Sequence, residues 1–84
     1  SRGLGDVYKR QPLVGIFYTA PGEGEAPFVS VGDRVKKGQT LGIVEAMKLM
    51  HEITCEQNGI VKEICAQNGD AVEYGQKLFI IEEA

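Results

Sequence analysis

Several kinds of residue are scarce in this 84-residue chain, and each scarcity excludes a class of function. Basic residues number nine against twelve acidic ones, which argues against nucleic acid as a partner because such binding depends on basic patches. No apolar run approaches the length of a membrane-spanning helix, so we expect no membrane partner. The chain has a single histidine, His51, and the sequence indicates no pair of a nucleophile and a base. We therefore expect His51 to be a surface residue rather than a catalyst.

Cysteine is also scarce. Cys55 and Cys65 lie ten positions apart, without a CxxC motif or a cluster of His and Cys. That spacing indicates neither a metal site nor a redox motif. We expect two buried free thiols, as in a reducing cytosol, with a disulfide as the alternative.

The first eleven residues, SRGLGDVYKRQ, read like the translation of a sequencing-library adapter. DVYKRQ is what the transposon end GAT GTG TAT AAG AGA CAG encodes, and segments of this kind are set aside in fold reasoning. We therefore expect residues 1–11 to be disordered and one small domain to occupy residues 12–84. Without that segment, six basic and eleven acidic residues remain, so the domain is more acidic than the whole chain.

An internal repeat organises the rest of the chain. At a constant offset of 37 residues, Val31–Ala46 (VGDRVKKGQTLGIVEA) and Asn68–Glu83 (NGDAVEYGQKLFIIEE) are identical at eight of sixteen positions. A match at a fixed period indicates a duplicated supersecondary unit. Equivalent residues of the two halves should then occupy equivalent core positions, namely Val35 with Val72 and Leu41 with Leu78.

Each half has the pattern of short β-strands, and no sustained helical period is present. Glycine-containing turn dipeptides bound the apolar runs. The strands are expected at Leu13–Tyr18, Thr40–Val44, Gly59–Ile64 and Lys77–Ile81, and the turns at Gly32-Asp33, Lys37-Gly38, Asn58-Gly59, Asn68-Gly69 and Tyr74-Gly75. The sequence therefore predicts an all-β fold: a flattened antiparallel barrel or sandwich of two halves related by a quasi-twofold axis.

One insertion distinguishes the halves. Gly15 and Gly32 are seventeen residues apart, whereas Gly59 and Gly69 are ten apart. The extra residues fall in TAPGEGEAP, residues 19–27, whose Gly, Pro and Glu do not continue a strand well. We expect this segment to project as a loop.

The hexapeptide EAMKLM, Glu45–Met50, falls where the two halves join. Met47-Lys48 is expected at the tip of a two-residue hairpin, although such tips favour Asn-Gly or Asp-Gly for their positive φ. A sequence that breaks local turn chemistry is where function is expected. The alternative is that Lys48 is an ordinary solvated turn residue and the methionines are core.

EAMKLM and the duplication around it resemble the biotinyl domain, whose signature is a modified lysine in an A-M-K-[ML] hairpin. The resemblance extends over residues 12–84. It implies a barrel-sandwich hybrid fold, with biotin linked through its carboxyl group to Lys48 by a biotin protein ligase. Met47 and its neighbours Glu45, Ala46 and Leu49 would then serve ligase recognition.

The inserted segment resembles the protruding thumb of biotin carboxyl carrier proteins of acetyl-CoA carboxylase. In that family the thumb lies near the biotin ring, which implies contacts from Thr19, Ala20 and Pro21. Ala20 stands where relatives can carry a hydroxyl residue. The resemblance implies a non-catalytic carrier that takes carboxybiotin from a biotin carboxylase subunit to a carboxyltransferase subunit, for malonyl-CoA and fatty acid synthesis. It also implies the cytoplasm of a bacterium or a plastid.

Three alternatives remain at this point. One is a biotinyl domain of another biotin-dependent carboxylase or decarboxylase, which the thumb disfavours. Another is a lipoyl domain, but there the lysine usually follows an acidic residue, as in D-K-A, whereas here Met47 precedes Lys48. The last is an unmodified structural module, such as the hairpin domains of efflux adaptors, which need no lysine at the tip.

Overall fold

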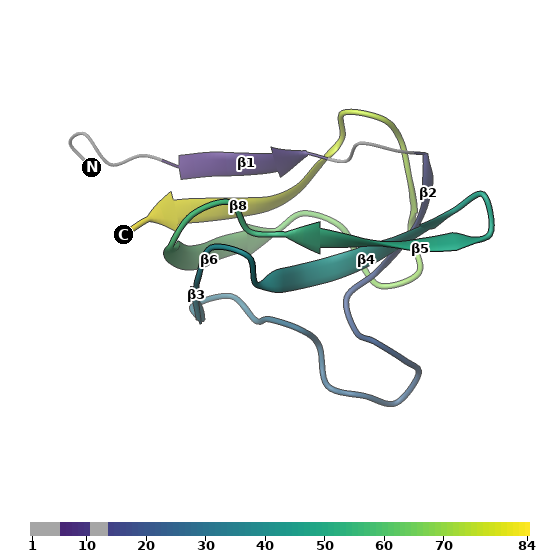
Figure 1. Ribbon diagram of the computed structural model, residues 1–84, viewed down its shortest axis with the longest axis horizontal. Coiled ribbons are helices and arrows are strands. Elements are labelled where there is room, and N and C mark those ends of the chain that lie inside the picture. The colour runs from purple at the N-terminus through teal and green to yellow at the C-terminus, as the bar shows by residue number, and fades with distance from the viewer. Residues whose placement is uncertain (1–5, 11–13) are drawn as a thin grey trace.

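The computed structural model describes residues 6–10 and 14–84, and every regular element in these ranges is a β-strand. All pairings are antiparallel and form two four-stranded sheets, in the orders β1-β8-β6-β3 and β5-β4-β2-β7 (Figure 1). The all-β prediction is therefore confirmed. The strands are β1 (Asp6–Arg10), β2 (Gly15–Tyr18), β3 (Arg34–Val35), β4 (Thr40–Ala46), β5 (Leu49–Thr54), β6 (Gly59–Ile64), β7 (Ala71–Val72) and β8 (Lys77–Glu83).

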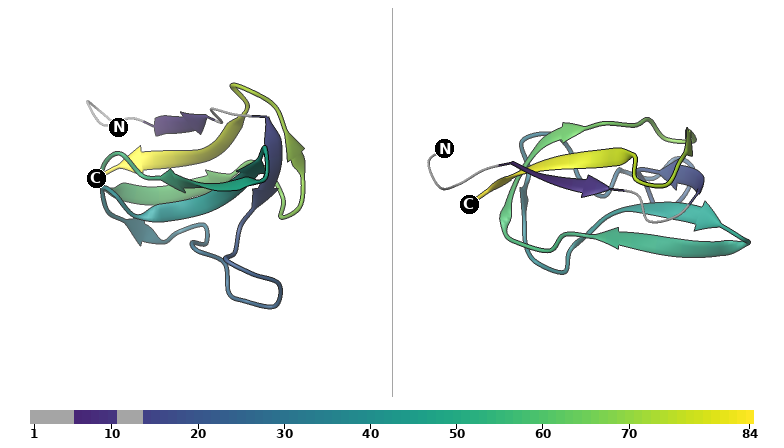
Figure 2. Two further views of the ribbon diagram at one scale, coloured as in Figure 1. Left: turned by 45° about the vertical axis from the view of Figure 1, so that its right-hand side comes forward. Right: turned by 90° about the horizontal axis from the view of Figure 1, so that it is seen from above.

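The pairings reproduce the quasi-twofold symmetry expected from the repeat. β2 of the first half pairs with β7 of the second, with Gly15 opposite Val72. In the symmetry-related pairing, β6 runs beside β3 with Gly59 opposite Val35. Each half thus contributes its two-residue strand, β3 or β7, to the sheet of the other half. Figure 2 shows the two layers that result, with the β4–β5 hairpin extending from one end.

The shared apolar positions of the repeat form the core between the sheets. Val35 and Val72 are 2% and 1% exposed, and Leu41 and Leu78 are 1% and 0% exposed, so their predicted equivalence is confirmed. The core is completed by an edge-to-face pair of aromatic rings, Phe17 and Phe79, with centroids 5.6 Å apart. Gly42 occupies the repeat position of Phe79, and the Phe17 ring packs against it, so the two halves fill one core with different residues.

Glycine permits a close backbone approach within each half, between β2 and β4 and between β6 and β8. A Cβ at Gly15 would lie 2.2 Å from the carbonyl oxygen of Glu45, and one at Gly59 would lie 2.4 Å from that of Glu82. Only a residue without a side chain fits there. The expected turn at Asn58-Gly59 is therefore wrong, because Gly59 is the first residue of β6. The other four turns are found, each with its glycine at positive φ.

The strand boundaries differ from those expected in three ways. β2 begins at Gly15 and leaves out Val14, while Leu13 lies outside the described residues. β4 continues to Ala46 and β8 to Glu83, because hairpin and sheet pairing extend regular structure past the apolar run. β3 and β7 were not predicted as strands, and each has only two residues. Such short segments carry no alternation that sequence reasoning can detect.

The expectation of disorder in residues 1–11 is wrong for Asp6–Arg10. These residues form β1, whose backbone pairs with β8 from Asp6 opposite Glu82 to Arg10 opposite Lys77. An edge strand such as β8 presents unpaired N–H and C=O groups to any extended segment within reach. The Lys77 ammonium group also lies 4.4 Å from the centroid of the Tyr8 ring. Residues 1–5 and 11 lie outside the described residues, and the adapter origin stays a prediction.

Substitutions at equivalent core positions should lower the free energy of unfolding by similar amounts. We expect Leu41→Ala and Leu78→Ala each to lower the free energy of unfolding by roughly 2–5 kcal/mol, because both remove fully buried methyl groups and leave a cavity. Val31→Ala, at a side chain 62% exposed, should change it by less than about 0.5 kcal/mol. Urea denaturation measures all three, and a large difference between the two leucine variants would contradict the equivalence.

Candidate functional site

The expected hairpin tip is present at the end of the molecule opposite the C-terminus (Figures 1 and 2). Ala46 of β4 pairs with Leu49 of β5, which leaves Met47 and Lys48 as the two turn residues. Their φ angles are 54° and 66°, and they are the only described non-glycine residues with positive φ. A left-handed conformation costs an ordinary residue about 1–2 kcal/mol. This turn is therefore strained, as expected where the sequence serves something other than folding.

The side chains around Lys48 divide between the core and solvent. Ala46 is 5% exposed, whereas Met47 is 91% exposed. Leu49 and Met50 are also mostly exposed, and Lys48 itself is exposed. The alternative in which the methionines are core residues is therefore wrong. The tip presents one amine surrounded by three exposed apolar side chains.

Glu45 connects this hairpin to β2. Cross-strand partners share a face of a sheet, and Glu45 lies opposite Ile16, next to Tyr18 on the outer face. The Tyr18 hydroxyl donates a hydrogen bond to Glu45 Oε1 at 3.1 Å. This bond raises the pKa of Tyr18 above its ordinary value, and burial and the Glu45 charge act in the same direction. The carboxylate therefore holds the Tyr18 ring beside the hairpin.

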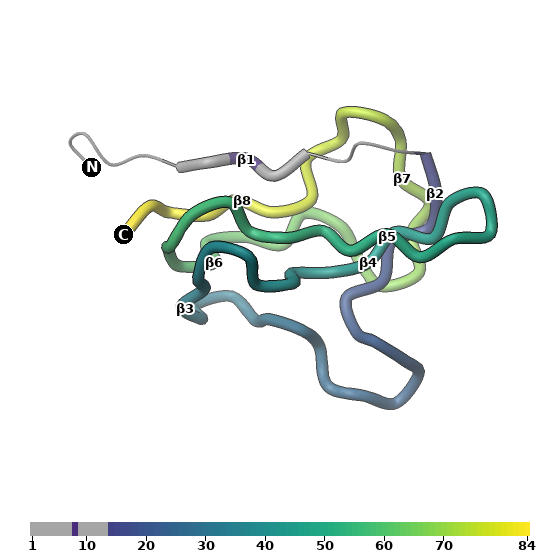
Figure 3. The backbone as a smooth tube through the Cα atoms, in the orientation of Figure 1, coloured from purple at the N-terminus to yellow at the C-terminus, as the bar shows by residue number. Residues whose placement is uncertain are grey.

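The segment of residues 19–27 projects from the sheets as a loop, which we call the thumb (Figure 3). Its base is closed where the Phe28 N–H donates to the carbonyl oxygen of Thr19 at 2.8 Å. The Thr19 N–H in turn donates to Asn68 Oδ1 at 2.9 Å, which joins the thumb to the second half. Within the thumb, Gly24 has positive φ and the Glu25 N–H donates to the carbonyl oxygen of Gly22.

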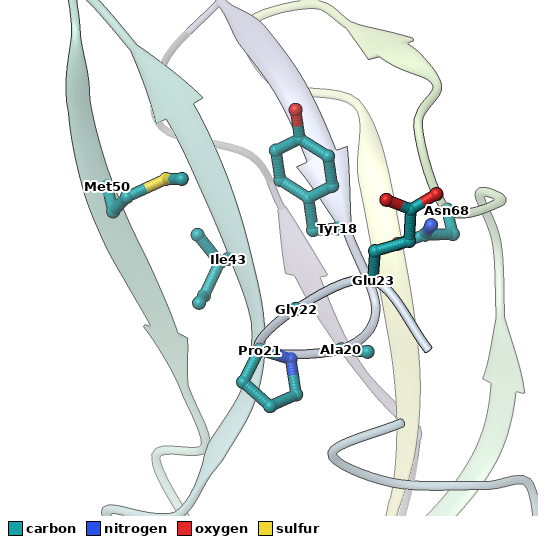
Figure 4. A pocket seen from close by; sticks show the side chains of 8 residues that line it. All are labelled: Tyr18, Ala20, Pro21, Gly22, Glu23, Ile43, Met50 and Asn68. Carbon is teal, nitrogen blue, oxygen red and sulfur yellow. The ribbon is translucent and has the colours of Figure 1, made fainter. Parts of the chain in front are cut away.

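A pocket of about 350 Å³ lies between the thumb and the outer face of the β2-β4-β5 sheet (Figure 4). Ile43 and Met50 lie on one side of it, and Glu23 and Asn68 on the other. The remaining lining residues are Tyr18, Ala20, Pro21 and Gly22. Pockets of this size, mostly apolar with a few polar groups, are typical of small-molecule sites.

Two of the three thumb residues predicted to contact biotin line this pocket. Ala20 and Pro21 line it, whereas Thr19 lies at the base of the thumb, hydrogen-bonded to Asn68. Sequence reasoning missed Tyr18, Ile43, Met50, Glu23 and Asn68. The alternation of β2 and β4 could have placed Tyr18 and Ile43 on the outer face, but no local signal indicates that the thumb folds over them.

His51 and the two cysteines do not line this pocket. His51 is half-buried on β5, opposite Val44. Both cysteines are free: Cys55 is buried and donates its S–H to the carbonyl oxygen of Gln57, but Cys65 is only half-buried. Burial raises the pKa of the Cys65 thiol, and the charge of Glu63 raises it further. The prediction of two buried thiols is therefore confirmed for Cys55 and wrong for Cys65.

Residues 6–10 and 14–84 contain no group of three or more His, Cys, Asp or Glu side chains placed to hold a metal ion. Within the same ranges, no helix has the length and apolar character needed to cross a bilayer.

Comparison with known families matches residues 10–81 to the biotin/lipoyl family described as "Biotin-requiring enzyme". The match covers most of the chain, so the chain belongs to this family. The resemblance to biotinyl domains that EAMKLM and the repeat indicated is confirmed.

Within the family, the chain is similar to biotin carboxyl carrier proteins of acetyl-CoA carboxylase. It is 59% identical to that of Nostoc sp. over 70 residues, which cover 83% of this chain and 38% of the relative. It is 55% identical to that of Porphyra purpurea over 71 residues, covering 84% and 45%, respectively. Identity to the chloroplastic carrier protein 2 of Arabidopsis thaliana is 50% over 72 residues, covering 86% and 28%. The chain thus spans less than half the length of each relative.

Solved structures show the same fold. The urea carboxylase of Kluyveromyces lactis matches 90% of this chain with a TM-score of 0.77 and 30% identity, over 6% of that enzyme. A single-chain, multi-domain long-chain acyl-CoA carboxylase matches 95% of this chain, also with a TM-score of 0.77, over 7% of its length. At 22% identity the second match shows the fold alone. The predicted barrel-sandwich hybrid is confirmed.

The strain at the tip predicts that a conventional turn stabilises the domain. Replacing Met47-Lys48 by Asn-Gly should raise the free energy of unfolding by about 1–2 kcal/mol, because these residues favour positive φ at both positions. Lys37→Asn is the matched control, since it changes an exposed turn lysine whose φ is not positive, and it should have little effect. Chemical denaturation compares the variants, and an unchanged or lower stability of the Asn-Gly variant would rule out strain at the tip.

The Tyr18–Glu45 hydrogen bond predicts a pH dependence. Glu45→Gln should lower the pKa of Tyr18 toward 10, because the charged acceptor that disfavours the phenolate is removed. The stability from this bond is present below the unfolded-state pKa of tyrosine and is lost as pH rises through the raised folded-state value. The pKa of Tyr18 is measured from its ¹³Cζ chemical shift as a function of pH. Glu52→Gln, whose carboxylate accepts from Thr40 instead, should leave the Tyr18 titration unchanged.

Proposed function

We propose that this chain is a biotin carrier domain in which biotin is joined to Lys48. The supporting observation is the position of Lys48 at the exposed apex of the hairpin between the two half-barrels, within EAMKLM. A biotin protein ligase would form an amide bond between Lys48 Nζ and the biotin carboxyl carbon of biotinyl-adenylate, with AMP leaving. This bond removes the positive charge of the lysine. A tip without covering structure gives the ligase access to the amine.

The neighbours of Lys48 would contribute to ligase recognition in different ways. Met47 and Leu49 offer exposed apolar surface, 91% and 61%, that a ligase can cover. Ala46 is buried, so its role is to let the hairpin join the core closely rather than to contact the ligase. Glu45 is held by Tyr18 and keeps the base of the hairpin in place.

The pocket beneath the thumb fits the ring system of biotin. Ile43, Met50 and the Tyr18 ring offer apolar walls, while Asn68 and Glu23 offer polar groups. Met50 is two residues beyond Lys48, about 7 Å along an extended strand. An arm attached to Lys48 therefore begins close to the pocket. In this proposal Ala20 and Pro21 contact the ring, and Thr19 anchors the thumb through Asn68.

The fuller function follows from the relatives, which are named as carrier proteins of acetyl-CoA carboxylase. We place this domain in the same role, carrying carboxybiotin from a biotin carboxylase subunit to a carboxyltransferase subunit that forms malonyl-CoA for fatty acid biosynthesis. The domain is a non-catalytic carrier whose covalent arm turns encounters with both subunits into intramolecular ones at high effective concentration. Relatives of bacterial and chloroplast origin support a bacterial cytoplasm or a plastid as its location.

This assignment is favoured over the alternatives by two observations. Identity reaches 59% with a carrier protein of acetyl-CoA carboxylase but 30% with urea carboxylase, which speaks against another carboxylase. Met47 before Lys48, in place of an acidic residue, speaks against a lipoyl domain.

Biotinylation of Lys48 tests the proposal. Co-expression of the chain with a biotin protein ligase should give a streptavidin-reactive product, heavier by one biotin less one water in intact mass. Lys48→Arg should abolish the label, because arginine keeps the charge but cannot form the amide. Lys37→Arg is the matched control and should be labelled like the parent. An unlabelled parent, or equal labelling of the Lys48→Arg variant, would contradict the proposal.

A further inference from the structure

The thumb pocket has one charged residue in its lining, Glu23, and no lysine or arginine. A second carboxylate, Glu45, accepts a hydrogen bond from the hydroxyl of Tyr18, whose ring also lines the pocket. A ligand in this pocket therefore lies near two carboxylates, without a cation in the pocket wall to offset their charge.

The pocket also offers both a hydrogen-bond donor and a hydrogen-bond acceptor to a ligand. Asn68 Oδ1 already accepts from the Thr19 N–H at 2.9 Å, and this fixes which end of the amide is oxygen. The Asn68 amide NH₂ is thereby left to donate, and the Glu23 carboxylate can only accept. Figure 4 shows Glu23 and Asn68 on the same side of the pocket. Together they match a neutral cyclic urea, which offers one carbonyl oxygen and N–H donors.

Carboxylation of the biotin ring changes two properties that matter for binding in this pocket. It breaks one ring N–H bond and forms an N–C bond to a carboxylate, so that one donor is lost and one negative charge is gained. The lost donor can no longer reach Glu23, and the new anion is repelled by Glu23 and Glu45. Both changes act against binding in a pocket with this lining.

We infer that Glu23 makes the thumb pocket selective for the uncharged ring of biotin over its carboxylated form. The inference rests on the proposed function, since it requires biotin on Lys48. The thumb then shelters the arm between turnovers and leaves the charged ring free for a partner subunit. Glu23 acts here as a specificity-determining residue of the carrier.

The test uses the biotinylated full chain, with the ¹⁵N amide shifts of Ala20 and Gly22 as reporters of ring docking. The samples carry biotin, biotin carboxylated by biotin carboxylase with ATP and bicarbonate, or the methyl ester of the carboxylated ring. The ester keeps the added bulk but not the charge. We expect the docked fraction to fall roughly fivefold or more on carboxylation, from repulsion between partly exposed charges, and to recover partly in the ester.

Two variants assign the effect. Glu23→Gln keeps the size of the side chain and should reduce the difference between neutral and carboxylated rings to less than about twofold. Glu63→Gln is the matched control, because Glu63 is exposed on β6 in the other sheet and does not line the pocket, and it should keep the wild-type difference. Added salt should weaken the difference in the wild type, since the charges are partly exposed.

Several results would overturn the inference. They are equal docking of both rings in the wild type, no docking of the neutral ring, release of the ester as complete as that of the carboxylate, or an unchanged difference in Glu23→Gln. Each of these leaves the biotinylation of Lys48 intact, because intact mass detects that bond separately. Absence of the added mass would instead show that the proposed function fails.

Discussion

The structure depends on the backbone pairing that the two halves exchange. The Phe17 N–H donates to the carbonyl oxygen of Asp70 at 2.8 Å, and in the other half the Val61 N–H donates to that of Asp33 at 2.9 Å. Buried backbone groups must be paired, and for both of these donors the acceptor belongs to the other half. The halves therefore fold as one unit. Gly15 lies opposite Val72 in this exchange, and a side chain there would collide with the carbonyl oxygen of Glu45 in β4.

The β4–β5 connection lies at one end of the molecule, where Met47 and Lys48 are exposed (Figure 2). The strand pairing that continues to Ala46 and Leu49 holds the base of the hairpin, so strain at Met47 and Lys48 stays local. About 1–2 kcal/mol at each turn residue is tolerable beside a core that includes fully buried residues such as Leu78. The strain and the apolar surface are thus consistent with a site that other proteins must reach.

Most of the fold could be predicted because the repeat imposes one arrangement on both halves. The offset of 37 residues predicts Leu41 and Leu78 in equivalent core positions, and the junction of the repeats predicts Lys48 at a hairpin tip. Predictions from local patterns were wrong where the same short sequence can occur in a turn or in a strand. Asn-Gly usually marks a turn, but Gly59 begins a strand because Glu82 of β8 passes too close for a side chain. The β1 pairing was missed because an edge strand accepts a partner through its backbone, which leaves little trace in sequence.

The sequence by itself determined the all-β class, the duplicated halves, the projecting thumb and the lysine at the junction. These follow from the order and spacing of residues along the chain, which periodicity and turn chemistry make readable. Only the tertiary structure decided that the thumb folds over the outer sheet face, and that Glu23, Asn68 and Tyr18 share one pocket. The physical reason is that these residues come from a loop, the opposite half-barrel and a strand, and contacts between such distant segments depend on packing that no local pattern encodes.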